Sequence, residues 1–389
     1  MGRKSIRKAL EIKSVFLLFS FSQISETLSH TTSPSPPSSS TANLRRILLG
    51  VLFGSLTGGF ASIVFLLSIR FFVLFANRIP ILDGPVTFSS KISVKTLKSV
   101  ISDYSGSPQL LGSNPNGKYL KFVLDNQLTV AVKMMLEPNC SKGSPRKNLG
   151  PWKREVQREL ELLAKVNHRN VMSLRAYIRD SDRLSLVYDY IPNGSLDDAM
   201  KRLRSDKLLF GWELRHRIAV GIVKGLKYLH FECTPRILHY DLKPSNVLLD
   251  ENFEPKLADC GLARLVMASL DTPVSSCYVA PECFQSCRYT DKCDIYSFGV
   301  ILSFLLTGRD PSDPFFMGVS GRGSLGRWLR HLQHAGEAQE ALDKKTVGEG
   351  DEEEMLMAIR IALVCQSDLP ADRPSSDELE AMLTQLHSF

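Results

Sequence analysis

The sequence predicts an α+β protein in which a single transmembrane helix precedes a two-lobed domain. Strand-like segments come first in this domain and helix-like segments follow them, which is an order typical of α+β proteins. Three observations favour this fold class. Residues 47–69 contain no charge, strand-like segments such as YLKFV and LTVAVKMM follow, and longer stretches with helical spacing of apolar residues come after them. With 389 residues, the chain is long enough for such a domain and an appendage.

Positive charge is concentrated at the start of the chain. Residues 1–100 contain 12 Lys and Arg against 3 Asp and Glu, a net charge of +9, whereas the whole chain carries +7. Residues 101–389 therefore carry a net charge of −2. A basic, apolar leader before a near-neutral domain indicates association with a membrane and argues against nucleic-acid binding.

Residues 1–22 have the pattern of a secretory signal peptide. Five basic residues up to Lys13 precede the short apolar run VFLLFSFS, in which Ser20 and Ser22 are small residues suited to a cleavage site. An uncleaved anchor or a disordered arm is the alternative interpretation. Residues 23–46 include TTSPSPPSSSTAN, which is too poor in apolar groups to fold, so we expect a short disordered extracellular segment.

Residues 47–69 are predicted to cross the membrane once. At about 1.5 Å per residue, a helix of this length crosses the roughly 30 Å hydrocarbon layer with modest tilt. Removal of the signal peptide would leave Arg45 and Arg46 outside, against five basic residues just after the span. The positive-inside rule then places the remaining chain in the cytosol, with residues 70–104 as a juxtamembrane segment.

Small residues recur every four positions within the predicted span. Gly50, Gly54, Gly58 and Ser62 share one helix face, where small side chains allow two helix backbones to approach closely. This face is predicted to pair with another transmembrane helix. The alternative is that glycine is simply common in membrane spans.

All the cysteines lie after residue 139, which favours a reducing compartment for that part of the chain. The eight cysteines are Cys140, Cys233, Cys260, Cys277, Cys283, Cys287, Cys293 and Cys365. The spacing of the four between 277 and 293 includes no CxxC pair and no paired histidines. We therefore expect ordinary buried or surface thiols rather than a metal site.

Seven short motifs follow one another along the rest of the chain. They are VAVK, ELELLAKVNHRNV, SLVYDYIPNGSL, LHYDLKPSN, LADCGLA, APE and DRPSSDEL. Together these motifs resemble those of plant receptor-like kinases, from about residue 105 to Phe389. The resemblance implies a bilobal protein-kinase-like fold for residues 105–389, with an antiparallel sheet and one helix in the first lobe and mainly helices in the second. It also implies that Glu282 of APE pairs with Arg373 of the last motif.

The same resemblance implies roles for six side chains in phosphoryl transfer. Lys133 would hold the nucleotide α- and β-phosphates, and Glu159 would pair with that lysine. Asp241 would orient the substrate hydroxyl, and Lys243 would neutralise the γ-phosphate. The expected Mg²⁺ ligands are Asn246 and Asp259.

A nucleotide site is implied at the edge of the first lobe. Gly112 and Gly117 would belong to the lid over the phosphates. Tyr188 would border the adenine pocket, and the backbone of Asp189 and Ile191 would offer it hydrogen bonds. ATP and Mg²⁺ are therefore the cofactors that the resemblance implies.

The lid departs from the family pattern GxGxxGxV. Asn114 adds bulk where glycine is expected, and Pro115 has no N–H to offer a phosphate. Tyr119 replaces a valine that would pack on the adenine, and its ring is large enough to fill the adenine pocket. Three such changes in one hairpin predict weak binding of ATP and Mg²⁺.

Further departures affect the regulatory parts. Tyr240 replaces the arginine of HRD, so the usual pairing with an activation-loop phosphate is not expected. Cys260 replaces the phenylalanine of DFG, which packs under the regulatory helix in active kinases. Val274 and Cys277 stand where the family has glycines before APE, so the substrate platform is expected to differ.

Two hypotheses follow, because every charged group expected to touch phosphate or metal is retained. The favoured one is a pseudokinase that serves as a membrane-tethered signalling adaptor and is catalytically inactive or weak. The alternative is a weakly active serine/threonine protein kinase, since transfer depends mainly on positioning and electrostatics. A self-sufficient peptide receptor is disfavoured because residues 23–46 are too short and polar to bind a peptide.

The departures and the short exterior resemble an atypical, membrane-anchored branch of the family. That resemblance implies a leucine-rich-repeat receptor-like protein without a kinase domain as the partner, joined through the face at Gly50, Gly54, Gly58 and Ser62. Other receptor kinases and self-association are further options. It also implies CLE-peptide perception in meristem maintenance. The implied location is the plasma membrane, with a pool in the endoplasmic reticulum left open.

Overall fold

The computed structural model describes most of the chain, which divides into two units. The described residues are 40–76, 84–102, 108–114, 117–136, 150–180, 183–262, 277–286, 288–317, 324–346 and 351–386. The first unit is Met1–Arg78 and the second is Ile79–Phe389. The predicted signal peptide, residues 1–22, lies outside the described residues.

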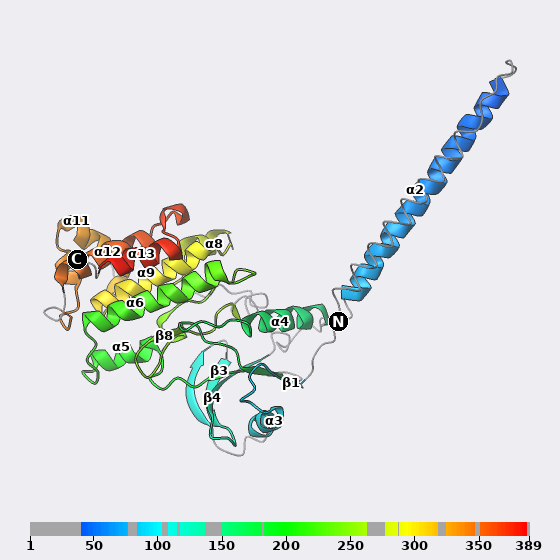
Figure 1. The fold of residues 1–389 in the computed structure, drawn as a ribbon. Coiled ribbons are helices and arrows are strands. Elements are labelled where there is room, and N and C mark those ends of the chain that lie inside the picture. Colours follow the sequence, from blue (N-terminus) through cyan, green and yellow to red (C-terminus); the bar gives the residue numbers. More distant parts are fainter. Residues whose placement is uncertain are drawn as a thin grey trace. The chain divides into compact units, whose positions relative to one another are not determined.

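The described part of the first unit is one long helix, α2, Ser40–Ala76 (Figure 1). Its segment Leu48–Phe72 has a mean hydropathy of 1.9 and none of it is buried, so it is long and apolar enough to cross a membrane. This candidate span overlaps the predicted one at 47–69. However, residues 40–46, expected to be disordered, are helical. An established helix extends cheaply, because each added residue gains a backbone hydrogen bond.

The first lobe of the second unit contains a six-stranded antiparallel sheet with the strand order β1-β5-β6-β4-β3-β2. The strands are β1 Gly84–Thr87, β2 Gln109–Asn114, β3 Gly117–Val123, β4 Thr129–Leu136, β5 Ala176–Arg179 and β6 Arg183–Asp189. Two helices accompany the sheet, α3 Val94–Ser102 and α4 Gly150–Leu163 (Figure 1).

Alternation along the strands divides the apolar side chains of the first lobe into two clusters. Leu186 of β6 packs with Leu160 of α4, whereas its neighbour Val187 packs with Leu97 of α3. Successive side chains of a strand point to opposite faces, so each face of the sheet is covered by a different helix. The predicted antiparallel sheet of the first lobe is confirmed.

The folded domain begins earlier than the predicted boundary at residue 105. Strand β1 pairs with β5, with Gly84 opposite Arg179, and α3 buries Leu97 completely. Residues 70–104 are therefore not juxtamembrane throughout. Without α3, the apolar face of β4 at Val130 and Val132, both fully buried, would be exposed to water. Lys95 and Lys98 on the exposed side of α3 gave this segment the composition of a juxtamembrane stretch.

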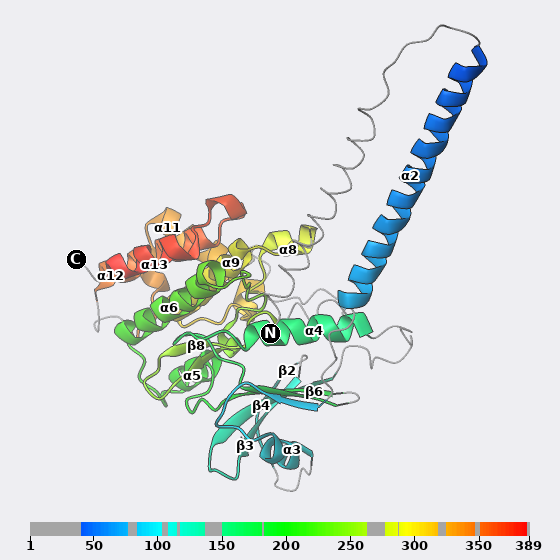
Figure 2. The same ribbon diagram turned by 45° about the vertical axis from the view of Figure 1, so that its right-hand side comes forward.

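The second lobe is mainly helical, as predicted. Its elements are α5 Leu196–Arg204, α6 Trp212–Lys227, η2 Tyr228–Glu232, η3 Pro244–Asn246, β7 Val247–Leu249, β8 Pro255–Leu257, α8 Pro281–Ser286, α9 Asp291–Thr307, α10 Pro314–Met317, α11 Leu325–Ala335, η4 Ala338–Ala341, α12 Glu352–Cys365, η5 Pro370–Asp372 and α13 Ser376–Gln385. Helices α6, α9, α12 and α13 lie alongside one another in both views (Figures 1 and 2).

Helix α9 forms the centre of this lobe. It is buried on nearly all sides, in keeping with its apolar sequence SFGVILSFLL. A Cβ atom at Gly299 would lie 2.7 Å from Cys365 Cβ and 2.9 Å from Ala362 O, so glycine is what allows α12 to approach. Gly308 ends α9 with a φ of 65°, the left-handed conformation that glycine adopts without strain.

Serine residues begin two of the helices with reciprocal hydrogen bonds. Ser195 accepts from the N–H of Asp198 while Asp198 accepts from the N–H of Ser195, and Ser375 and Glu378 do the same for α13. Each arrangement satisfies N–H groups that lack a partner within the helix. The cap at Ser195 fixes α5 immediately after the segment that joins the two lobes.

Candidate functional site

The side chains expected to handle phosphate and metal converge where the sheet meets the helical lobe. Lys133 lies on β4, Asp259 follows β8, and Asp241 lies in the loop before η3. Lys133 Nζ contacts Asp259 Oδ2 at 2.6 Å, and the two side chains are 2% and 6% exposed. The pair joins the two lobes through one buried ionic hydrogen bond.

The partner of Lys133 differs from the one that the resemblance implied. Glu159 is half-buried on α4. Between these two described side chains the structure has no ion pair, because Lys133 pairs with Asp259. A carboxylate buried as deeply as Asp259 is strongly destabilised without a cation, and Lys133 supplies that charge. The Lys133–Glu159 pair is thus absent from this arrangement.

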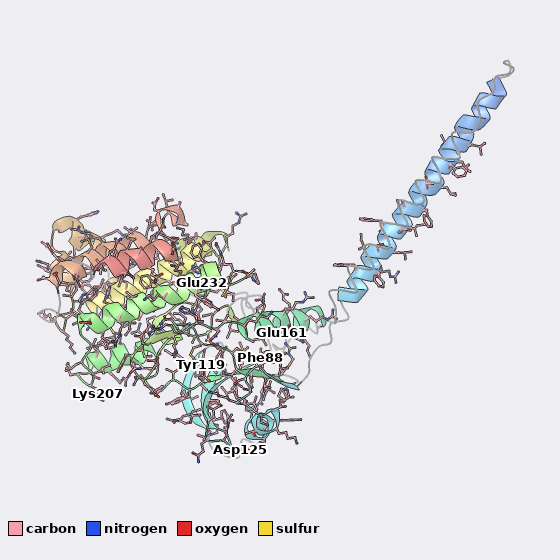
Figure 3. All side chains as sticks on the ribbon, viewed as in Figure 1. Phe88, Tyr119, Asp125, Glu161, Lys207 and Glu232 are labelled. Atoms are coloured by element: carbon pink, nitrogen blue, oxygen red, sulfur yellow. The ribbon has the colours of Figure 1, made fainter. Side chains whose placement is uncertain are left out.

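Tyr119 also reaches the same carboxylate. It lies on β3 directly opposite Lys133 in the sheet register, and its hydroxyl donates a hydrogen bond to Asp259 Oδ2. Lys133 Nζ lies 5.2 Å from the centre of the Tyr119 ring. Figure 3 labels Tyr119 where the sheet approaches the helical lobe. Occupation of the adenine pocket by this ring stays a prediction, whereas the contact of its hydroxyl with the expected metal ligand was not foreseen.

The atoms around Asp259 fit a divalent cation only in part. Oδ2 already accepts from two donors, whereas Oδ1 is buried without a hydrogen-bond partner among the described residues. The amide NH₂ group of Asn246 donates hydrogen bonds to Asp241 O at 2.8 Å and to Asp241 Oδ2 at 3.1 Å. The amide oxygen of Asn246 is then the atom able to bind a metal. Asp259 could therefore offer Mg²⁺ only Oδ1, because Tyr119 and Lys133 both occupy Oδ2.

The residues expected to act on the substrate hydroxyl form a connected cluster. Lys243 Nζ contacts Asp241 Oδ2 at 2.7 Å, and Asn246 holds the same carboxylate from the other side. Asn246 is buried at the end of η3, whereas Asp241 and Lys243 are half-buried. The structure therefore brings together Asp241, Lys243 and Asn246 as the motif predicts.

The lid requires glycine at only one of its two expected positions. Gly117 has a φ of 150°, and a Cβ there would lie 2.5 Å from Met134 O. A Cβ at Gly112 would meet no atom within 4 Å. Gly112 follows an irregularity in the β2–β3 pairing. Pro115 lies outside the described residues, so its predicted effect on phosphate binding stays a prediction.

The segment expected to contact adenine follows β6. Asp189 ends that strand and accepts from Arg175 Nε at 3.0 Å and Nη2 at 2.6 Å, while Ile191 is half-buried just beyond it. Burial raises the pKa of the Tyr188 phenol well above its usual value, and the nearby Asp259 raises it further. Tyr188 therefore stays neutral between this segment and Asp259.

A small cavity lies beside Cys260. It has a volume of about 10 Å³ and is lined by Leu163, Val166, Val171, Met172, Leu174, Tyr188, Asp259 and Cys260. Cys260 is 7% exposed, and burial raises the pKa of its thiol well above the usual value. The sulfur thus acts as a small apolar group where the family has phenylalanine. The space that remains is about enough for one water molecule.

Tyr240, which stands where the family has the arginine of HRD, takes part in an aromatic pair. Its ring lies 4.5 Å from that of Tyr289, whose hydroxyl donates to Asp294 Oδ1 at 2.7 Å. Asp294 is fully buried. Although burial opposes ionisation, hydrogen bonds from His230 and the His239 N–H keep the pKa of Asp294 below its usual value. An anionic centre beside Tyr240 would repel a phosphate group.

The ion pair predicted between APE and the last motif is confirmed. Arg373 Nη1 contacts Glu282 Oε1 at 2.6 Å, and Nη2 contacts Oε2 at 2.9 Å. The arginine side chain is fully buried. This two-bond geometry connects α8 to the segment before α13.

The role of Tyr119 is the main feature of the site that sequence reasoning missed. The signal that could have revealed it is the register of β3 and β4, which places Tyr119 directly opposite Lys133.

Among the described residues, no group of three or more His, Cys, Asp or Glu side chains could hold a metal ion.

Comparison with known proteins agrees with the arrangement of these residues. The protein kinase domain family matches residues 107–375. The Arabidopsis thaliana protein CORYNE, an inactive leucine-rich repeat receptor-like protein kinase, is 60% identical over 325 residues, which cover 82% of this chain and 79% of CORYNE. The leucine-rich repeat receptor-like serine/threonine/tyrosine-protein kinase SOBIR1 of the same plant is 36% identical over 72% of this chain and 45% of its own length.

A solved structure shares the fold. The pseudokinase domain of BIR2, an immune regulator of the RLK/Pelle family, superimposes with a TM-score of 0.63 and 28% identity, over 81% of this chain and 93% of that domain. The expectation of an inactive or weak kinase agrees with CORYNE and BIR2. The chain belongs to the protein kinase family, among the plant leucine-rich repeat receptor-like kinases.

Proposed function

We propose that this chain is a membrane-anchored pseudokinase that acts as a signalling adaptor, or co-receptor, for a leucine-rich-repeat receptor-like protein without a kinase domain. In this proposal the complex perceives CLE-family peptides and maintains plant meristems. It would act at the plasma membrane, with the kinase-like domain in the cytosol. One observation supports the inactive character: Tyr119 and Lys133 both donate to Asp259 Oδ2, so the expected phosphate-binding lysine is held by the expected metal ligand.

Three features of the site oppose phosphoryl transfer. The lysine expected on the nucleotide phosphates is engaged by Asp259. A tyrosine hydroxyl competes with metal for the same carboxylate. In addition, a cysteine and a small cavity replace the aromatic side chain that supports α4 in active kinases. Each feature affects positioning, on which phosphoryl transfer chiefly depends.

The adaptor role is supported by the relatives and by the span. CORYNE is an inactive kinase and BIR2 is an immune regulator with a pseudokinase domain. Gly50, Gly54 and Gly58 recur every four residues along α2, and small residues at this spacing let a second helix approach closely. Ser62 donates its hydroxyl to Gly58 O at 2.9 Å, which satisfies its polar group within the helix.

Nucleotide binding by the full-length protein in detergent tests the inactive character. A ligand at a hundred times its Kd stabilises a protein by about 2.7 kcal/mol, so Mg·ATP should raise the melting temperature measurably if it binds. We expect no shift for the wild-type protein and a shift for Tyr119→Val, in which the competing hydroxyl is gone. The double variant Tyr119→Val, Lys133→Ala should lose that shift again.

Signalling tests the adaptor role separately. Lys133→Ala with Asp241→Ala should complement a loss-of-function plant as well as the wild type does, provided that the variant folds and reaches the membrane. A Mg·ATP shift in the wild-type protein together with loss of complementation by this variant would show that catalysis is required.

One observation favours the second candidate function, a weakly active serine/threonine protein kinase. Asp241, Lys243 and Asn246 remain assembled as in an active enzyme. If this function holds, purified wild-type protein transfers labelled phosphate to serine or threonine, and Asp241→Asn abolishes the transfer. Equal background labelling by both proteins contradicts it.

A further inference from the structure

Two thiols of the second lobe face each other between α8 and α9. Cys283 lies on α8, and Cys293 lies in the first turn of α9. The Cys283 thiol donates to Cys293 Sγ across a sulfur–sulfur distance of 3.2 Å. Both residues are free cysteines. A disulfide has its sulfur atoms about 2.05 Å apart, so a movement of roughly 1 Å would suffice to join them.

The two cysteines differ in exposure. Cys283 is half-buried, with the exposed Phe284 next to it, whereas Cys293 is 0% exposed. A small oxidant can therefore reach the first sulfur from solvent, and the second sulfur stands directly behind it. This is the arrangement of an attacking and a resolving thiol.

The electrostatics assign the same roles. A thiolate at Cys283 would accept a hydrogen bond from the Cys293 thiol, and this lowers the pKa of Cys283 below its usual value. The same contact and burial raise the pKa of Cys293. Burial also raises the pKa of Cys233 and Cys277. Among these four thiols, Cys283 carries the largest thiolate fraction at neutral pH, and the thiolate is the reactive form.

We propose that Cys283 and Cys293 form a peroxide-sensitive dithiol, a modification site that closes into an intramolecular disulfide. The Cys283 thiolate attacks one oxygen of a hydroperoxide, the O–O bond breaks, and the sulfur becomes a sulfenic acid while hydroxide leaves as water. The Cys293 sulfur then attacks the sulfenic sulfur, the S–O bond breaks, and a second water is released. Two thiols are oxidised and one hydrogen peroxide is reduced to two waters.

The oxidation would affect the Glu282–Arg373 ion pair of this lobe. Cys293 Sγ also donates to Glu282 Oε1 at 3.4 Å, the oxygen that accepts from Arg373. Its sulfur accepts from the Thr290 N–H at 3.3 Å at the start of α9. A disulfide has no S–H, so Glu282 would lose one donor while α8 became covalently attached to α9. The modification would thus link the redox state to the contact between APE and Arg373.

A peptide map of the full-length protein in detergent tests the proposal. The protein is treated with hydrogen peroxide at neutral pH, remaining thiols are blocked with N-ethylmaleimide, and the trypsin digest is analysed by mass spectrometry. Cleavage after Arg264, Arg288, Lys292 and Arg309 places Cys283 and Cys293 on different peptides, 265–288 and 293–309. We expect these two peptides to be linked, with fragmentation assigning the bond to Cys283 and with dithiothreitol releasing it.

Two variants separate this pair from its neighbours. Cys287 lies on the same tryptic peptide as Cys283, so Cys287→Ser is a matched control that should keep the link. Cys283→Ser should abolish the link. In a timed labelling with limiting iodoacetamide, wild-type Cys283 should react before Cys277, although Cys277 is the more exposed residue.

Either of two results would overturn the proposal. One is a wild-type digest in which peroxide leaves peptides 265–288 and 293–309 unlinked while Cys283 is oxidised only to sulfinic or sulfonic acid. The other is a link that persists in Cys283→Ser, because the bond would then lie on Cys277 or Cys287, the other cysteines of peptide 265–288. Both results are read on the protein itself and do not depend on nucleotide binding or signalling, so the proposal stands or falls independently of the proposed function.

Discussion

Tyr119 and Asp259 lie 140 residues apart in the sequence and are joined by a hydrogen bond from the tyrosine hydroxyl to Asp259 Oδ2. The bond joins the lid strand of the first lobe to the segment that follows β8 in the second. Because Lys133 contacts the same oxygen, the bond is part of a three-residue cluster that occupies the expected metal ligand. Breaking that cluster should alter both stability and ligand binding.

Tyr119→Phe should destabilise the protein while leaving the ring in place. A hydrogen bond to a charged group contributes about 1.5–3 kcal/mol, so the melting temperature of the full-length protein in detergent should fall by several degrees. Tyr190→Phe is the control, because the ring of Tyr190 contacts Lys121 Nζ at 4.3 Å and would keep that contact. Equal melting temperatures for wild type and Tyr119→Phe would argue against this bond.

Cys260→Phe should not restore an active kinase arrangement. The cavity beside Cys260 has a volume of about 10 Å³, far too small for a phenyl ring. Overpacking of a core typically costs about 1–3 kcal/mol, so the melting temperature should fall. Cys260→Ala, which removes volume, serves as the control for loss of the sulfur. A rise in melting temperature for Cys260→Phe, accompanied by Mg·ATP binding, would contradict this expectation.

Arg373→Ala should be among the most damaging single changes in the second lobe. Removing one partner of a buried pair costs about 3–5 kcal/mol, because Glu282 would keep its charge without a counter-ion. Thermal unfolding and membrane yield measure the loss. Arg217→Ala is the matched control, since Arg217 forms a longer, half-exposed pair with Glu254 at 3.6 Å. A similar loss for both variants would show that burial of the pair is unimportant.

The Glu282–Arg373 pair should also make stability depend on acid pH. Burial would raise the pKa of Glu282, but its hydrogen bonds from Arg373 outweigh burial and hold the pKa below the usual 4.5. A carboxyl group whose pKa is lower in the folded state than in the unfolded state stabilises the protein at pH values above the unfolded-state pKa. This contribution is lost as the pH falls through the folded-state pKa. The wild-type melting temperature should therefore fall more steeply than that of Glu282→Gln below about pH 4.5. Parallel curves would disprove the linkage.

Gly54→Leu combined with Gly58→Leu should abolish co-precipitation with a leucine-rich-repeat receptor-like protein expressed in the same membrane. Leucine side chains on this face would prevent the close helix approach that small residues allow. Gly59→Leu is the matched control, because residue 59 lies about 100° around the helix from Gly58. Association that survives the double change would exclude this face as the interface.

Much of the site followed from the order of the motifs. The positions of Asp241, Lys243 and Asn246 within one loop, and the Glu282–Arg373 pair, agree with what the motifs implied. Local spacing was sufficient for the first three because they lie within six residues of each other. For the ion pair, the resemblance supplied the long-range information that spacing lacks.

The ion-pair partner of Lys133 could not be predicted from motif order or local spacing. The resemblance implied Glu159 as the partner of Lys133, and no local spacing indicated that Asp259, 126 residues away, would pair with it instead. Which one pairs depends on how α4 and the segment after β8 pack against β4, and on how deeply each carboxylate is buried.

By itself, the sequence determined the apolar helix, the alternating strands and the buried helix α9, because these depend on periodicity, and its motifs identified the charged residues of the site. The tertiary structure decided the rest. It placed β1 and α3 on the sheet, brought the Tyr119 hydroxyl to Asp259, and set the Cys283 and Cys293 sulfur atoms side by side. Such contacts join segments whose relative positions are set by packing of the whole core, which no local pattern encodes.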